Sequence, residues 1–298
     1  MSQPAPRYAE IEQRIRRLER QNGRWRSVTL ISMLAAGGLA AAQLSPPAGA
    51  IGDARRTLEG EALVLRDASG TPRIGMSATQ GGALIEVLDE RGARRAALGM
   101  DAGESFLILG DDQRRTRIVM SVGADDRSLE LYDSGGRRRA ALTEAGEGVG
   151  IEFYDTSEKR RAALLTTSEV PALTLSDGSG RTRMGLGVGE DGPDLEMYDD
   201  AGKRRMAIGA IQDRGARLAL FDRDGLPRMG LGVTGAGPTI VLSDDTVTPR
   251  AQIEVTRDGP GVILNNAAGR PFSAMSAMAA RPAFAVLDGE GRVIYAAP

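Results

Sequence analysis

An aspartate recurs through the last three quarters of the chain, and regularly spaced carboxylates are the groups here that could bind a metal ion. Successive aspartates lie 22 residues apart in nine steps and 23 in one, with Asn266 in the single place where Asp is missing. Gly stands three residues after the Asp in eight of the eleven copies, and Arg stands six residues after it in nine. The repeated aspartates are Asp67, Asp89, Asp111, Asp133, Asp155, Asp177, Asp199, Asp222, Asp244 and Asp288.

Turn formation explains the aspartates better than calcium does. Calcium-binding β-repeats use short glycine-rich units with closely placed Asp, and the 22-residue unit lacks that arrangement. Asp followed three residues later by Gly is typical of a type I turn, in which the carboxylate accepts hydrogen bonds from nearby backbone N–H groups. We therefore expect these residues to shape turns, with no metal bound. The Arg six residues on would limit repulsion between carboxylates of neighbouring repeats.

Composition argues against an enzyme. The 298 residues include no His and no Cys, so the usual general base, thiol catalysis and thiolate metal ligation are all excluded. The glycine-rich stretch 185–189 lacks the Lys-Ser/Thr ending of a phosphate loop. No Ser stands in a nucleophile-elbow sequence. We expect no catalytic residues, no cofactor and no small-molecule substrate.

Each repeat reads as two β-strands. The positions two and four residues before the Asp are apolar in all eleven copies, which predicts a short strand with one buried face. In the copy around Asp133, this pattern predicts that Leu131 is a buried core residue. A second strand follows the turn, as in residues 95–98 and 205–208, and a polar link such as 189–192 returns the chain.

The repeat number favours one all-β architecture over another. A β-propeller blade would need two repeats, so eleven repeats would give an unclosed five and a half blades. A β-solenoid with one repeat per coil predicts a near-constant step, as observed. We therefore favour a solenoid about 50 Å long at about 4.8 Å per coil, with a propeller or another closed meander as the alternative.

Two copies of the motif carry a resemblance to a known family. The phrases Leu131-Tyr132-Asp133-Ser134-Gly135-Gly136-Arg137 and Met197-Tyr198-Asp199-Asp200-Ala201-Gly202-Lys203 resemble the YD repeats of Rhs-family proteins. Tyr precedes the repeat Asp at three places only, and the large shell-forming length and toxin domain of that family are missing. The resemblance implies a β-strand repeat and no activity.

The first quarter of the chain has a different pattern, which predicts a membrane anchor. Residues 1–26 carry seven Arg and three Glu, and their apolar positions follow the 3-4 spacing of an amphipathic or coiled-coil helix. Residues 27–45 are uncharged and, as a helix, would span about 28 Å, close to the thickness of a hydrocarbon core. We expect a linker over 46–61 and the repeat domain over 62–298.

The charge asymmetry predicts the orientation of that anchor. Its Arg-rich flank should stay in the cytoplasm, which places the repeats in the periplasm of a bacterial inner membrane as part of a single-pass protein. A cleaved signal peptide is the alternative, because residues 48–50 read Ala-Gly-Ala. Small residues at close spacing, which let another helix approach, are Ser32, Ala36, Gly37, Gly38 and Ala40.

Two functions remain open. In the favoured one, the protein is a non-catalytic accessory subunit that stabilises or organises a larger membrane complex, with the lipid bilayer and integral membrane proteins as its partners. Its plan is similar to that of single-span subunits of bacterial reaction-centre–light-harvesting and respiratory assemblies. In the other, it is a self-associating envelope module that binds a protein or glycan. Residues 27–298 carry a charge of −6 with no one-sided basic stripe, so nucleic-acid binding is not expected.

Overall fold

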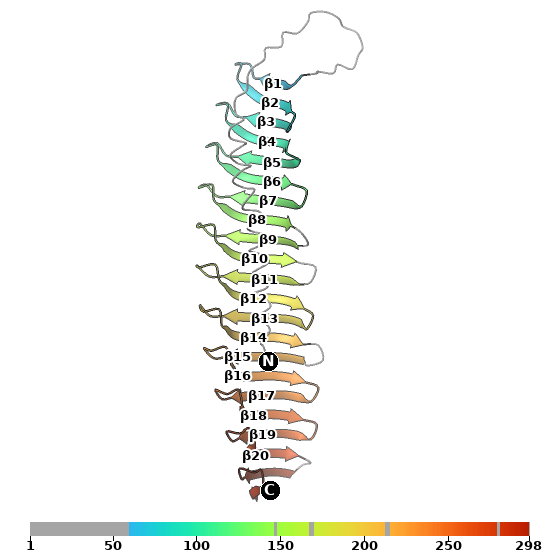
Figure 1. The fold of residues 1–298 in the computed structure, drawn as a ribbon, viewed down its shortest axis with the longest axis vertical. Coiled ribbons are helices and arrows are strands. Elements are labelled where there is room, and N and C mark those ends of the chain that lie inside the picture. Colours follow the sequence, from blue (N-terminus) through green and yellow to red (C-terminus); the bar gives the residue numbers. More distant parts are fainter. Residues whose placement is uncertain (1–59, 146–147, 167–169, 212–214, 279–280, 298) are drawn as a thin grey trace, which may run out of the picture.

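The repeat region forms 22 β-strands in the computed structural model, which describes residues 60–145, 148–166, 170–211, 215–278 and 281–297 (Figure 1). No helix in these ranges is long and apolar enough to cross a membrane. The predicted segments 1–26 and 27–45, and the helix-packing residues Ser32 to Ala40, lie outside the described residues. The strands are β1 (Ala62–Arg66), β2 (Pro72–Thr79), β3 (Gly82–Leu88), β4 (Arg94–Asp101), β5 (Glu104–Gly110), β6 (Thr116–Val122), β7 (Asp126–Tyr132), β8 (Arg138–Ala145), β9 (Gly148–Tyr154), β10 (Arg160–Thr166), β11 (Pro171–Ser176), β12 (Thr182–Gly189), β13 (Gly192–Tyr198), β14 (Arg204–Ile211), β15 (Gly215–Phe221), β16 (Pro227–Thr234), β17 (Gly237–Ser243), β18 (Pro249–Thr256), β19 (Gly259–Asn265), β20 (Pro271–Met278), β21 (Arg281–Leu287) and β22 (Val293–Ala297).

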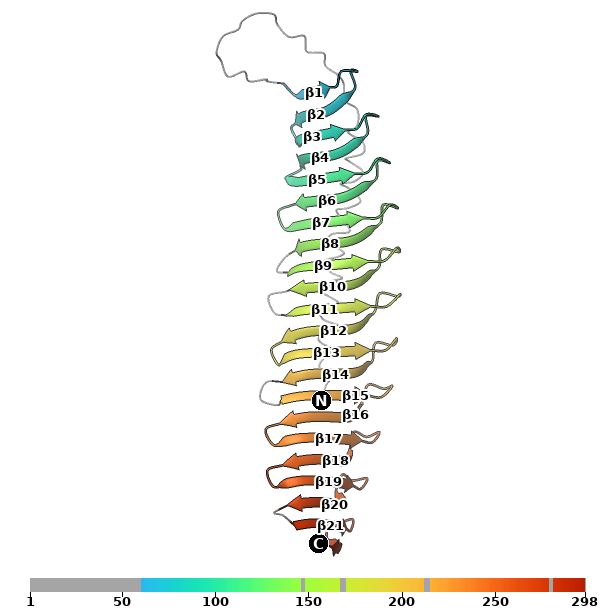
Figure 2. The same cartoon turned by 180° about the vertical axis from the view of Figure 1, so that it is seen from behind.

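The strands follow one another in a single antiparallel meander. Each strand pairs with the strand before it and the strand after it, from β1–β2 through to β21–β22. Figures 1 and 2 show one layer of strands stacked along the long axis, with β1 and β22 at opposite ends. The expectation of an all-β repeat region with two strands in each repeat is confirmed for the residues described.

The arrangement of the repeats differs from the favoured prediction. A solenoid with one repeat per coil requires each strand to stack in parallel on its equivalent in the next repeat, whereas every pair here is antiparallel and links neighbours in sequence. The sheet is also unclosed, which excludes a propeller or another closed meander for this region. The ladder of 22 strands is about 100 Å long at about 4.8 Å per strand, roughly twice the length expected for a solenoid.

One face of this sheet is apolar along its whole length. Because side chains alternate between faces, the positions four before and nine after each repeat Asp form one continuous row across the strands, from Leu63 to Ala297, and every member is apolar. A second row, two before and seven after the Asp, runs from Leu65 to Tyr295 with Ser273 as its polar member. We call these two rows the apolar face.

No second layer of described residues covers the apolar face. Its side chains are partly open to solvent, and Leu131 is 42 %, Leu164 51 % and Met275 56 % exposed. The prediction that Leu131 is buried is therefore wrong for the single chain. The pattern before the Asp identified the correct face, but a sheet buries a face only when another layer lies against it.

The opposite face holds the buried residues. Its central row lies three before and eight after the repeat Asp, and it alternates small residues with larger ones. Ala97, Ala141 and Ala163 are almost fully buried there, beside partners such as Glu86 and Glu152 on the adjacent strands. We call it the polar face, because Glu, Arg and Tyr side chains gather on it.

The third residue after the Asp adopts a left-handed backbone in every repeat turn. Its φ is +77° at Gly136, and it stays positive in the three turns that lack Gly, at Arg114, Glu158 and Val247. A side chain with a branched β-carbon is strained in this region. The backbone of the turn therefore favours the eight glycines, and among the three residues that replace Gly, Val247 is the least suitable.

We expect Val247→Gly to raise the free energy of unfolding by about 1–2 kcal/mol, because it removes the steric cost of a left-handed Val. The matched reverse change is Gly136→Val. A β-carbon at Gly136 meets no atom within 4 Å, so its loss of stability, of similar size, would report backbone strain alone. Thermal unfolding followed by circular dichroism measures both. Equal stability of Val247→Gly and wild type would contradict this account of the turn.

Candidate functional site

The repeated Asp side chain holds its turn together through backbone hydrogen bonds. In the fourth repeat, Oδ1 of Asp133 accepts from the N–H of Gly135 at 2.8 Å and of Arg137 at 3.0 Å. The backbone N–H of Asp133 donates to the carbonyl oxygen of Arg137 at 2.9 Å, and the N–H of Gly136 donates to the carbonyl oxygen of Asp133 at 3.0 Å. One carboxylate oxygen thus closes a five-residue turn.

The same geometry recurs in all eleven turns, including the one without a carboxylate. Oδ1 of Asn266 accepts from the N–H of Ala268 at 2.9 Å and of Arg270 at 3.1 Å, as the Asp residues do at the same offsets. The turns join odd-numbered strands to even-numbered ones, so they line one long edge of the sheet (Figure 2). An amide oxygen suffices for this role, which requires an acceptor and no charge.

The second carboxylate oxygen pairs with the Arg six residues on. That Arg is an extra residue in its strand, because the pairing register shifts by one there, as at Arg139 between the pairs Tyr132–Arg138 and Leu131–Ala140. The bulge turns the Arg side chain back toward the turn. Arg161 lies 2.6 Å from Asp155, and Arg228 lies 2.5 Å from Asp222.

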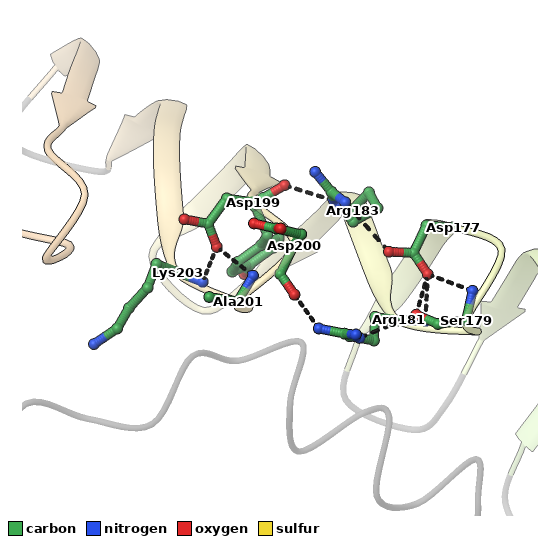
Figure 3. A network of polar contacts seen from close by, with 9 residues as sticks. Asp177, Ser179, Arg181, Arg183, Asp199, Asp200, Ala201 and Lys203 are labelled. Atoms are coloured by element: carbon green, nitrogen blue, oxygen red, sulfur yellow. Dashed lines mark hydrogen bonds and ion pairs between the residues drawn. The ribbon is translucent and has the colours of Figure 1, made fainter.

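The same Arg also joins some repeats to the next. The Nε of Arg139 donates to the carbonyl oxygen of Tyr154 at 2.9 Å, and that of Arg183 donates to Tyr198 at 2.9 Å. Figure 3 shows Arg183 between the Asp177 turn and the following turn. The Arg is therefore a structural link between turns, and the ion pairs with its own Asp are longer in these repeats, at 3.6 Å for Arg139 and 3.2 Å for Arg183.

A second link between turns comes from the residue four after the Asp. Arg181 donates to the carbonyl oxygen of Asp200 in the next turn (Figure 3), and Nζ of Lys159 donates to that of Gly178 at 3.3 Å. These cations thus join successive turns through backbone oxygens and do not contact the Asp side chain of the next repeat.

The polar face carries clusters of Glu, Tyr and Arg. Oη of Tyr154 donates to Glu152 at 2.5 Å, and Nη1 of Arg160 lies 3.1 Å from the same carboxylate. The pairs Tyr132–Glu130 and Tyr198–Glu196 repeat the contact. The guanidinium of Arg138 lies 4.0 Å from the centre of the Tyr154 ring, a cation–π distance that joins two repeats. Sequence reasoning missed these clusters, although Glu two residues before Tyr was a visible signal.

The contacts of the repeat Asp residues bear on two possible roles, metal binding and proton transfer. No three Asp or Glu side chains in those ranges gather as metal ligands would. The pKa of every repeat Asp is held below its ordinary value, because hydrogen bonds favour the charged form. At Asp133 the N–H of Arg137 has the largest effect, and at Asp244 the Thr246 hydroxyl does, lowering that pKa to about 2. A general base needs a pKa near neutrality, so these carboxylates are unsuited to that role.

The geometry defines a class of protein: an all-β repeat protein built as a one-layer open sheet with a structural turn column. No protein-family model and no curated protein matches it. Similar stretches occur in a Photorhabdus luminescens Tc holotoxin pore (10 % identity, 78 % of this chain, 17 % of that chain, TM-score 0.18) and in a TcdB2–TccC3 structure (10 %, 78 %, 18 %, 0.19). A mutant of S. aureus TarM in complex with Fondaparinux, alpha-GlcNAc-glycerol and UDP matches 45 % of this chain and 21 % of its own at 8 % identity, with a TM-score of 0.18. The chain spans about a fifth of these proteins, and at such scores the likeness carries no argument about fold or activity.

We expect the repeat domain to lose stability as the pH falls from about 4 to about 2. Each repeat Asp has a lower pKa folded than unfolded, so its contribution is complete above the unfolded value of about 3.8 and is lost as protonation of the folded form begins. Thermal unfolding at a series of pH values measures this loss. Asp244→Asn should reduce it, since the amide keeps the turn bonds as Asn266 does. An acid dependence unaffected by that substitution would contradict the assignment, as would a rise in melting temperature with calcium.

Proposed function

We propose that this protein is a non-catalytic structural subunit that is anchored in a bacterial inner membrane and stabilises or organises a larger complex there. The observation that carries the proposal is the one-layer sheet, whose apolar face is open along about 100 Å. Exposed apolar patches beyond a few hundred Å² mark interaction surfaces. A rigid ladder with such a face is suited to contact other proteins over a long distance.

The chemistry of the turn column supports a structural role. Each repeat Asp accepts hydrogen bonds from the turn backbone with one oxygen, and in all ten repeats that carry Asp the other oxygen lies within 4.0 Å of an Arg. Polar side chains that are satisfied within the fold are poor candidates for substrate binding. The turn column differs little from one repeat to the next, whereas an active site is a constellation of particular residues at one place.

The anchor follows from the sequence. The uncharged segment 27–45 has the length of a membrane span, and the Arg-rich 1–26 segment would remain cytoplasmic. Eight of the eleven residues from 32 to 42 are Ser, Ala or Gly, which favours close approach of a neighbouring helix over contact with lipid. We therefore propose integral membrane proteins as the partners of this segment.

The experiment that tests this partner assignment is a co-purification in mild detergent. Ala36→Leu combined with Ala40→Leu should keep membrane insertion, because hydrophobicity rises, and should lower the yield of co-purified membrane proteins at least several-fold. The matched control is Ser27→Leu with Ser45→Leu, nine residues to either side of Ala36, which raises hydrophobicity on the opposite face of the predicted helix. Equal yields from both double variants would contradict the proposal and leave the segment as a simple tether.

We expect the repeats to lie outside the cytoplasm. Protease added to intact spheroplasts should digest the repeat domain and spare an epitope tag placed before Tyr8, because the basic flank is retained on the cytoplasmic side. Detergent-lysed cells are the control, in which the tag is lost as well. Loss of the tag in intact spheroplasts while the repeats survive would invert the proposed topology.

A further inference from the structure

The apolar face is far larger than the exposed patches of ordinary soluble proteins. Its two rows cross all 22 strands, and a third row six before and eleven after the repeat Asp widens it with residues such as Val122, Val188 and Val233. Three rows at about 6.8 Å each and 22 strands at about 4.8 Å give a strip of about 20 by 100 Å. This area of roughly 2,000 Å² lies on one side of a single chain.

Charge does not oppose the approach of an identical face. The two central rows contain no charged residue from β1 to β22. In the third row, Arg127 and Glu144 are paired with each other at 2.8 Å, so they present a neutral unit, and the remaining charged member, Glu61, is exposed before β1 at the end of the ladder. The ionised turn column lies along one edge of the strip, beyond its apolar rows. Two copies could therefore meet face to face without burying an unpaired charge.

We propose that the apolar face packs against the same face of a second copy, which gives a two-layer dimer. A partner for this strip must itself be apolar and long, and an identical chain supplies the same length and the same 22-residue period. Contact between identical patches forms a closed two-fold dimer. The apolar face of each copy is then buried, and no further copy can add to it to form a fibre. Sheets packed this way lie about 10 Å apart, with side chains of both inner faces interdigitating.

The buried area is sufficient for such a dimer. Flat strips 20 Å wide that cross at the usual angle of about 30° would overlap over about 800 Å² per copy, or about 1,600 Å² in total, the size of a standard specific interface. Strips that twist together along their full length would bury about 4,000 Å², within the range of obligate homodimers. Either limit supports a stable pair. This inference assigns the apolar face, on which the proposed function rests, to a second copy, and it leaves residues 27–45 as the proposed contact with membrane partners.

The absence of native Cys makes the test direct. Leu186 lies on the apolar face in β12, near the middle of the ladder, so a fully overlapping two-fold pair brings its two copies together whichever way the ladders run. Full-length Leu186→Cys in isolated membranes should form a covalent two-chain product with a bis-maleimide reagent. Arg217→Cys, exposed on the polar face in β15, should form several-fold less. Equal cross-linking of the two variants would overturn the proposal.

Subunit number provides the second measurement. Native mass spectrometry of the full chain in nanodiscs should give two chains, and a mass of one or three chains would overturn the two-sheet packing. Leu186→Asp should lower the association constant at least tenfold, because an uncompensated charge would be buried, whereas Arg217→Asp should change it less than about twofold. Leu186 is about half exposed in the single chain, so the Asp variant keeps its fold, which circular dichroism verifies. Loss of the dimer with unchanged co-purification of membrane proteins would leave the proposed function intact.

Discussion

The hydrogen bonds from the turn backbone to the repeat Asp are the constraint on which the ladder depends. The carboxylate fixes a five-residue turn, the turn sets the bulge at the following Arg, and the bulge restores the register in which apolar positions oppose each other. Because one residue of slip would move every side chain to the other face, eleven identical turns are needed to keep one face apolar. Asn266 accepts the same turn hydrogen bonds without a charge, so the turn needs only an acceptor oxygen. The negative charge of the Asp residues instead pairs with the neighbouring Arg.

A one-layer sheet gains its stability only from neighbouring strands. Each repeat contacts the repeat before it and the repeat after it, so stability is a sum of repeat and neighbour terms, as in other linear repeat proteins. Links such as Arg139 to Tyr154 and Arg181 to Asp200 strengthen those neighbour terms on the turn edge. In the Asn266 repeat Phe272 stands exposed in place of the Arg, so the first kind of link is missing there, while Arg270 keeps the second kind by donating to the carbonyl oxygen of Gly289 at 3.5 Å.

Much of the local structure could be predicted from the sequence. The Asp–Gly spacing identified the turns, and the apolar positions two and four before Asp133 identified the first strand and its inward face. The layer arrangement could not be predicted, because a 22-residue period fits a coil and a two-strand hairpin equally well. The pattern predicts a buried Leu131 wrongly, because it reveals which face is apolar and not what lies against that face. The bulge at Arg139 was missed, although the odd spacing between Asp and Arg follows from it.

The single 23-residue step indicates which feature the chain preserves. The extra residue falls between β14 and β15. The pairs that join these two strands, such as Met206–Leu220 and Ile208–Leu218, stay in the apolar rows. The extra residue therefore lengthens the connection between the strands and does not change the register of the apolar face. The polar face varies far more, with Ala, Gly, Glu, Thr and Val in equivalent positions. The chain therefore holds constant the surface that it leaves uncovered, which is the behaviour of an interface and not of a monomer's exterior.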